Sequence, residues 1–238
     1  MLRGIWAFFV LTVATVILGL PVVLFAPLFP RWIAFPTKMA RAWSRVMLLT
    51  IGARVTYHDP HGALRQSRCI YIANHQSNVD IWVLAKVMPY GTRFVAKQEL
   101  FRIPVLGPAM TAAGFIRINR SNRAEAIRSL TRAAESIRGG RPLILFPEGT
   151  RSKNGKLQPF KKGAFHLAMQ AGVPVIPVAI RGTFEILPPK SLRVRPGPVE
   201  VYFERPIDLS EMESDRPRDL LEAVHAVIAS RLDRTSDP

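Results

Sequence analysis

The chain has 238 residues, enough for one domain with an attachment, and it is 48% hydrophobic, which excludes an intrinsically disordered protein. Its 33 lysines and arginines outnumber its 17 aspartates and glutamates, giving a formal net charge of +16. Such a surface suits polyanions, meaning nucleic acid, anionic lipid head groups or phosphorylated substrates. The single cysteine, Cys69, excludes an internal disulfide and a cysteine-rich metal site.

The first segment of the chain is uncharged from Ile5 to Phe29. At about 1.5 Å per helical residue, this stretch is long enough to cross a hydrocarbon core of about 30 Å. A signal peptide fits less well, because the run is too long and no A-x-A cleavage site follows it. Pro21 and Pro27 leave two alternatives open: a short membrane span, or a segment that enters one leaflet and turns back.

Every charged residue between this run and Asp59, the first acidic residue of the chain, is basic. The basic residues closest to the run are Arg31, Lys38, Arg41 and Arg45. By the positive-inside rule, this excess predicts attachment to the cytoplasmic (inner) membrane, with the main domain on the cytoplasmic side.

Residues 38–50 predict a helix lying in the membrane interface. Met39, Trp43, Val46 and Met47 share one face, and the cations Lys38, Arg41 and Arg45 occupy the opposite face. An amphipathic helix packed on a soluble core would show the same pattern, but the position directly after an apolar anchor favours membrane contact.

Beyond Gly52, strand-like and helix-like segments alternate. The pattern predicts strands at 54–57, 69–73, 93–96, 115–118, 143–146, 173–180 and 199–203, with helices near 79–88, 123–138, 163–170 and 219–232. This alternation predicts an α/β fold with a mixed or mostly parallel sheet flanked by helices. The domains are therefore expected to be a membrane anchor with interfacial helix at 1–50 and an α/β domain at 51–238.

The stretch 74–80, with the sequence NHQSNVD, follows the predicted buried strand at 69–73. His75 has the chemistry of a general base near neutral pH, and Asp80 that of a carboxylate able to fix the imidazole tautomer. Ser77-x-x-Asp80 is also a helix capping box, which would need no catalytic role.

A second polar stretch, 146–152 with the sequence FPEGTRS, follows the apolar run 143–145. It is therefore expected at the carboxyl end of a strand, where α/β sheets bind ligands. Gly149 permits close approach of backbone amides, Thr150 supplies a hydroxyl, and Arg151 offers a fork suited to phosphate. Glu148 is predicted to orient the arginine or a substrate hydroxyl.

Two further stretches contribute candidates. In 114–120 (GFIRINR), Arg120 ends a predicted strand and has the reach to bind a phosphate, although a surface cation would give the same pattern. In 173–180 (VPVIPVAI), Pro177 lacks a backbone donor and predicts an edge strand or a bulge.

Together the four stretches resemble the glycerol-phosphate acyltransferase superfamily, and most closely its 1-acyl-glycerol-3-phosphate (lysophosphatidic acid) acyltransferases. His75 and Asp80 fit the family motif N-H-x-x-x-x-D, and 146–152 fits F-P-E-G-T-R-S without a mismatch. The stretches 114–120 and 173–180 are similar to two further family blocks, although Asn119 stands where relatives commonly carry aspartate. The resemblance extends over about residues 40–207.

The resemblance implies transfer of a fatty acyl group from acyl-CoA or acyl carrier protein to the sn-2 hydroxyl of lysophosphatidic acid. His75 and Asp80 would be the catalytic residues, and Arg120, Glu148, Gly149, Thr150 and Arg151 would bind substrate. No metal and no cofactor beyond the thioester co-substrate is implied, and an anionic membrane surface would be the lipid partner.

Two alternatives remain at this level. In the first, the chain is an acyltransferase whose acceptor is glycerol-3-phosphate or another lysophospholipid. A basic, membrane-tethered nucleic-acid-binding protein would share the charge, but the chain shows neither a basic platform interleaved with aromatic residues nor a helix-turn-helix pattern, so no nucleic acid is expected as a partner.

Overall fold

The computed structural model describes residues 2–29, 34–119, 121–212 and 216–233. Its helices are α1 (Leu2–Phe25), α2 (Ala34–Ile51), α3 (Val79–Val87), α4 (Leu106–Ala112), α5 (Arg123–Arg138), α6 (Gly163–Ala171), α7 (Thr183–Ile186) and α8 (Pro217–Asp233). Its strands are β1 (Ala53–His58), β2 (Ile70–Ala73), β3 (Arg93–Lys97), β4 (Ile116–Ile118), β5 (Leu143–Leu145), β6 (Val175–Arg181) and β7 (Gly197–Phe203). Short 3-10 helices occur at Ala63–Arg65, Gln98–Arg102 and Leu209–Glu211.

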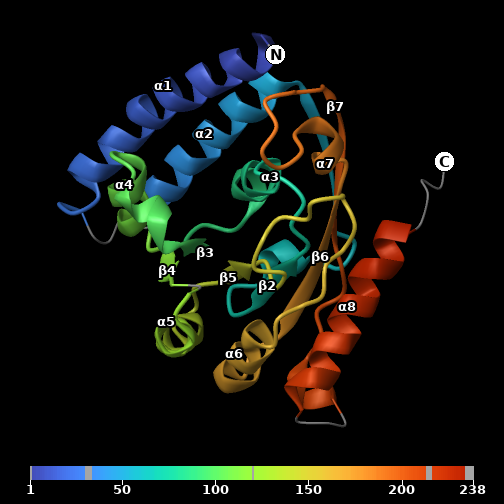
Figure 1. The fold of residues 1–238 in the computed structure, drawn as a ribbon. Helices are drawn as coiled ribbons and strands as arrows, with labels where there is room; N and C mark the ends of the chain where they lie inside the picture. The colour runs from blue at the N-terminus through green and yellow to red at the C-terminus, as the bar shows by residue number, and fades with distance from the viewer. Residues whose placement is uncertain (1, 30–33, 120, 213–215, 234–238) are drawn as a thin grey trace.

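The strands form one seven-stranded sheet in the order β1-β7-β6-β2-β5-β3-β4 (Figure 1). Every neighbouring pair is parallel except β6 and β7, which are antiparallel. The predicted mostly parallel α/β sheet flanked by helices is thus confirmed. Only α4, α7 and the 3-10 helices were not expected, because these segments are short and lack a sustained periodicity.

The prediction that Pro177 marks an edge strand or a bulge is wrong. Strand β6 lies inside the sheet between β7 and β2. The ladder with β7 ends at the pair Val178–Phe203, and the carbonyl of Pro177 accepts a hydrogen bond from the amide of Glu204, 3.0 Å away. Pro177 therefore occupies the position where β7 leaves the sheet, so its missing N–H removes no pair from that ladder.

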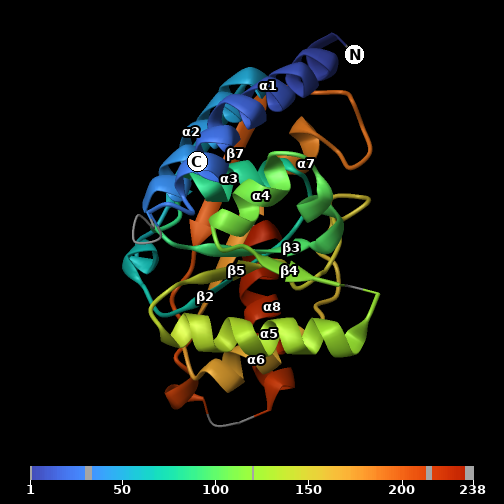
Figure 2. The ribbon, with the colours of Figure 1, turned by 90° about the vertical axis from the view of Figure 1, so that its left-hand side faces the viewer.

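Helices cover both faces of the sheet, and each face has its own apolar core. Helices α5, α6 and α8 cover one face, while α2 and α3, with α1 outside them, cover the other (Figure 2). Strand β2 shows how the sequence serves both cores: Ile70 and Ile72 enter the first core, and Tyr71 and Ala73 enter the second. Cys69 is buried beside them, as a small apolar residue would be.

Helix α1 is long and apolar enough to cross a membrane, and it includes Pro21 without interruption. It packs against α2 and α4, and its buried residues include the small residues Gly4, Ala7 and Ala14. A Cβ on Gly4 would lie 1.8 Å from the carbonyl oxygen of Leu192, so only glycine permits this approach. The outward face remains apolar and exposed, as Phe8 (65% exposed) illustrates.

Helix α2 differs from its predicted role. Met47 is fully buried, Trp43 packs edge-on against Trp82 of α3, and Met39 lines a cavity. Part of the apolar stripe that was predicted to contact lipid therefore contacts protein, whereas Val46 of the same stripe is 37% exposed. The physical reason is that α1 lies outside α2 and supplies the exposed apolar surface instead (Figures 1 and 2). Arg31, one of the cations that predicted orientation, lies outside the described residues.

Candidate active site

The catalytic candidates meet in the turn between β2 and α3. The chain leaves β2 at Ala73, and Asn74 anchors the turn to β6: its amide donates to the carbonyl of Ile180 at 2.9 Å and accepts from the amide of Ile180 at 2.7 Å. These two bonds fix the backbone just before His75. The turn is therefore held at the carboxyl end of a central strand, where α/β sheets place ligands.

His75 and Asp80 are in direct contact. The Nδ1 atom of His75 lies 2.8 Å from Oδ2 of Asp80, and their side chains are 11% and 0% exposed. With Nδ1–H donating to the carboxylate, Nε2 is the ring nitrogen left to act as a base, and His75 lines a cavity. The ring of Phe146 stacks on the imidazole at 4.1 Å between centroids, which restricts its rotation.

Asp80 also closes the turn. Its Oδ2 accepts from the backbone amides of Gln76 (2.7 Å) and Ser77 (2.8 Å), and its Oδ1 accepts from the hydroxyl of Thr183 at 2.5 Å. The bond from the Ser77 amide is one half of a capping box. The two interpretations of this spacing are therefore compatible: the same carboxylate caps the start of α3 and holds the histidine.

Glu148 lies behind this turn. It is 3% exposed, its Oε1 accepts from the amide of His75 at 2.6 Å, and its Oε2 accepts from the amide of Gln158 at 3.2 Å. Burial raises the pKa of the Glu148 carboxyl to about 7, with the two amide bonds opposing and the nearby Asp80 adding to that rise. This geometry favours positioning of the His75 backbone over the substrate contact predicted from the sequence.

The turn after Glu148 presents the remaining candidates. Gly149 has a φ of 73°, a backbone conformation that favours glycine, and Nζ of Lys161 lies 2.9 Å from where its Cβ would be. Thr150 is exposed, and Arg151 is half-buried and lines the same cavity as His75. The structure thus places the predicted phosphate-binding arginine and the predicted base on one cavity.

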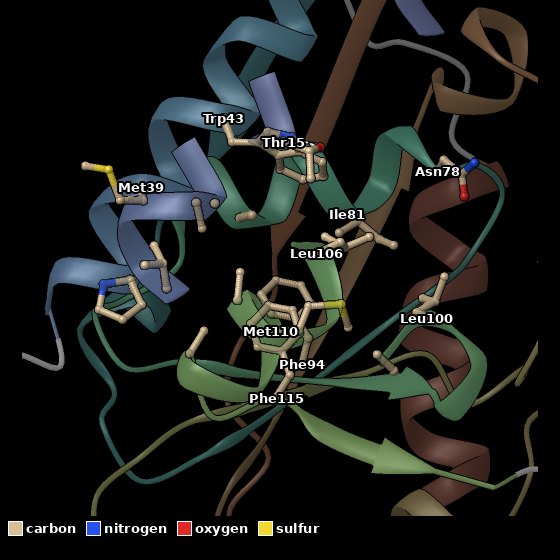
Figure 3. Close-up of a pocket in the computed structure, with 18 of the residues that line it drawn as sticks. Thr15, Met39, Trp43, Asn78, Ile81, Phe94, Leu100, Leu106, Met110 and Phe115 are labelled. Atoms are coloured by element: carbon tan, nitrogen blue, oxygen red, sulfur yellow. Dashed lines mark hydrogen bonds between the residues drawn. The ribbon is translucent and has the colours of Figure 1, made fainter. Parts of the chain in front are cut away.

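This cavity has a volume of about 330 Å³ and is mostly apolar. Its walls come from α1, α2, α3, β3 and α4, segments that are far apart in the sequence. Figure 3 shows Thr15 and Trp43 on one side of the space, with Phe94, Met110 and Phe115 across it. The Trp43 indole donates to the hydroxyl of Thr15 at 3.1 Å, which leaves little polarity on that wall.

Several supporting residues were not found from the sequence. Thr183 reaches Asp80 from a helix 103 positions away, Gln158 supplies an amide to Glu148, and Ser152 donates its amide to the carbonyl of His75 at 2.8 Å. Thr183 and Gln158 lie outside the four motif stretches, and Ser152 belongs to the 146–152 stretch, but its backbone bond to His75 has no signal in the sequence. Arg120, in contrast, was predicted to bind phosphate but lies outside the described residues.

Asn119 also has a place in the structure. Its amide donates to the carboxylate of Glu125 at 2.8 Å, and its Oδ1 accepts from Ser121, so it braces the start of α5. Within the described ranges, His, Cys, Asp and Glu side chains do not gather in groups of three or more that would suit a metal ion.

Comparisons with known proteins agree with this geometry. A family model described as "Acyltransferase" matches residues 54–181. The chain is 36% identical to the 1-acyl-sn-glycerol-3-phosphate acyltransferase of Cocos nucifera over 195 residues, covering 82% of this chain and 63% of the relative. It is 35% identical to the enzyme of the same name from Salmonella typhimurium over 210 residues, covering 88% and 83% of the two chains.

Among solved structures, the chain is similar to the 1-acyl-sn-glycerophosphate (LPA) acyltransferase PlsC of Thermotoga maritima. The TM-score is 0.85 at 27% sequence identity, and the match covers 99% of this chain and 97% of that one. The chain therefore corresponds to nearly the whole of this neighbour, whereas it spans less than two thirds of the Cocos nucifera protein.

Proposed function

Because the chain belongs to the acyltransferase family, together with the 1-acyl-sn-glycerol-3-phosphate acyltransferases, we propose that it transfers a fatty acyl group from a thioester to lysophosphatidic acid. The acceptor is the free sn-2 hydroxyl, and the product is phosphatidic acid. The observation that carries the proposal is the His75–Asp80 pair at one end of an apolar cavity, with Arg151 on the same cavity.

In the proposed reaction, Nε2 of His75 takes the proton of the acceptor hydroxyl as its oxygen attacks the thioester carbonyl. A tetrahedral intermediate forms, the carbon–sulfur bond breaks, and His75 returns the proton to the departing thiolate. Asp80 keeps the proton on Nδ1 and stabilises the imidazolium while it exists. The acceptor hydroxyl is itself the nucleophile, so the protein supplies none.

Recognition of the acceptor rests on the Gly149–Arg151 turn. A guanidinium forms two parallel hydrogen bonds with a phosphate monoester, and Arg151 lies close to the proposed base on the shared cavity. The ammonium of Lys161 beside Gly149 adds positive potential to the same turn. Holding the phosphate here would orient the neighbouring hydroxyl toward His75.

The apolar cavity suits the acyl chain of the donor. Its lining from α1 and α4 is mostly apolar and includes Leu18, Val22, Leu106, Ala109 and Met110. Acyl-CoA and acyl carrier protein present the same chain in thioester linkage, so both are proposed donors.

Attachment to the cytoplasmic membrane through α1 completes the proposal. The outward face of the helix is apolar, and only 11% of its most apolar 18-residue stretch is buried. A lysophospholipid resides in the bilayer, and cations close to the segment favour the cytoplasmic side.

The test is a panel of substrates offered to the full-length protein in neutral detergent. Lysophosphatidic acid, glycerol-3-phosphate and lysophosphatidylcholine would be compared as acceptors with one acyl-CoA, and acyl carrier protein would replace CoA in a second series. We expect phosphatidic acid to form fastest. Acylation of glycerol-3-phosphate or lysophosphatidylcholine in preference to lysophosphatidic acid would overturn the assigned acceptor.

A further inference from the structure

The loop between α7 and β7 combines cations with an exposed leucine. Lys190, Arg193 and Arg195 are exposed, Leu192 is 56% exposed, and residues 187–196 include no acidic side chain. An apolar side chain flanked by cations is the composition of a segment that lies at an anionic membrane surface. None of these side chains contributes to the cavity or to the His75–Asp80 turn.

The loop lies directly against the first turn of α1. The carbonyl of Leu192 is so close to Gly4 that no side chain would fit between them. Figures 1 and 2 both place this loop beside the N-terminal end of α1. That end of the helix is strongly apolar on its free side, since Ile5, Trp6 and Phe9 are 55%, 56% and 57% exposed.

We propose that residues 190–195 form a second membrane-binding element, which contacts anionic phospholipid head groups through Arg193 and Arg195 and inserts Leu192 beside α1. The inference rests on the proposed function insofar as α1 lies in the membrane. An acidic protein would also attract the cations, but the contact with α1 and the exposed leucine favour lipid.

This element is connected to the catalytic turn. The hydroxyl of Ser77 donates to the carbonyl of Leu187 at 2.7 Å, and Thr183 at the start of α7 donates to Asp80. The amide of Arg195 returns to the carbonyl of Ile186 at 3.0 Å, which ties the two ends of the loop together. Docking of the loop therefore fixes the depth of the His75–Asp80 turn relative to the head groups.

The experiment uses an environment-sensitive dye on a Leu192→Cys variant of the full-length protein, reconstituted into vesicles. Labelling is specific because burial raises the pKa of Cys69 to about 12 and shields its thiol. In vesicles of phosphatidylglycerol and phosphatidylcholine, we expect the dye to be quenched by nitroxide-labelled lipid. In the double variant Arg193→Gln/Arg195→Gln, the equilibrium constant for docking of the loop on the vesicle should fall roughly fivefold for each cation removed.

Two controls match this design. A dye on Arg68→Cys, at the opposite end of β2 from His75, should stay unquenched, and Arg65→Gln/Arg68→Gln removes equal charge far from the loop. The proposal would be overturned if nitroxide-labelled lipid did not quench the dye at residue 192, or if the dye responded only to added acyl carrier protein. It would also be overturned if the two charge-removing pairs weakened docking equally. Acyl transfer is measured separately in neutral detergent, so loss of the proposed function is distinguished from failure of this surface.

Discussion

The turn at residues 74–80 and the apolar cavity beside it are built in opposite ways. The turn is short in sequence and held by hydrogen bonds: Asp80 alone accepts from His75, Thr183 and two backbone amides. The cavity is assembled from five elements and held by apolar packing, with Thr15, Leu18 and Val22 of α1 in one wall. The polar turn is thus specified by a local motif, and the apolar cavity by long-range assembly.

This difference predicts different failures. Loss of one polar group in the turn should reduce the reaction while the protein stays folded, because neighbouring bonds hold the backbone. A change in the cavity wall should alter which substrates fit and leave the chemistry intact. The following substitutions test that division in order of decreasing expected effect.

His75→Ala removes the proposed base and should lower kcat by about 10²–10⁴-fold. The fold should persist, because Asp80 keeps its bonds to two backbone amides and Thr183. Thiol release from acyl-CoA and the melting temperature report the two properties. His61→Ala, an exposed histidine elsewhere, serves as the control and should be neutral. Near wild-type turnover in folded His75→Ala protein would refute the mechanism.

Arg151→Ala should raise the KM for lysophosphatidic acid by roughly 10- to 100-fold, the value of a lost hydrogen-bonded charge pair of about 1.5–3 kcal/mol. The KM for acyl-CoA should change less, and Arg151→Lys should recover only part of the loss. Steady-state kinetics with each substrate varied in turn measure this. Lys153→Ala, an exposed cation two positions on, is the matched control. A lowered melting temperature with equal losses for both substrates would mean that Arg151 only braces the turn.

Ala109→Phe places a ring in the cavity wall between α4 and α1. It should lower kcat/KM for palmitoyl-CoA about tenfold relative to octanoyl-CoA, because a shortened apolar site excludes part of the longer chain. The ratio of kcat/KM for the two donors is the measurement. Thr111→Phe, on the exposed side of α4, should leave the ratio unchanged. An unchanged ratio in Ala109→Phe would show that the acyl chain of the donor does not occupy this cavity.

Glu148→Gln should change the pH dependence of stability. The Glu148 carboxyl has an ordinary pKa of 4.5 but a pKa of about 7 in the folded protein. At a pH between these two values, Glu148 is mostly protonated in the folded protein and mostly ionised in the unfolded chain. The contribution of Glu148 to the free energy of unfolding therefore falls as pH rises through this window. As pH rises through this window, the melting temperature of the wild type should fall relative to that of Glu148→Gln. A difference that stays constant would contradict the shifted pKa.

The sequence predicted the turn well because its information is local. The strand before His75, the spacing to Asp80 and the cap of α3 all lie within about a dozen residues, and the structure confirms the contact between the two side chains. Thr183 was missed because its partner lies 103 positions away. The packing of Trp43 and Met47 of α2 on protein was missed for the same reason, since amphipathicity does not say which surface covers a helix face.

The close fit of α1 has a consequence for engineering. An anchor that merely tethers an enzyme is exchangeable for another apolar helix of similar length. Here Gly4 and Gly19 have no room for a Cβ without displacing Leu192 or Val105, and α1 residues such as Thr15 line the cavity that His75 also lines. A chimaera with a foreign helix in this place would therefore have a cavity of a different shape. A truncation lacking α1 would lose one wall of that cavity.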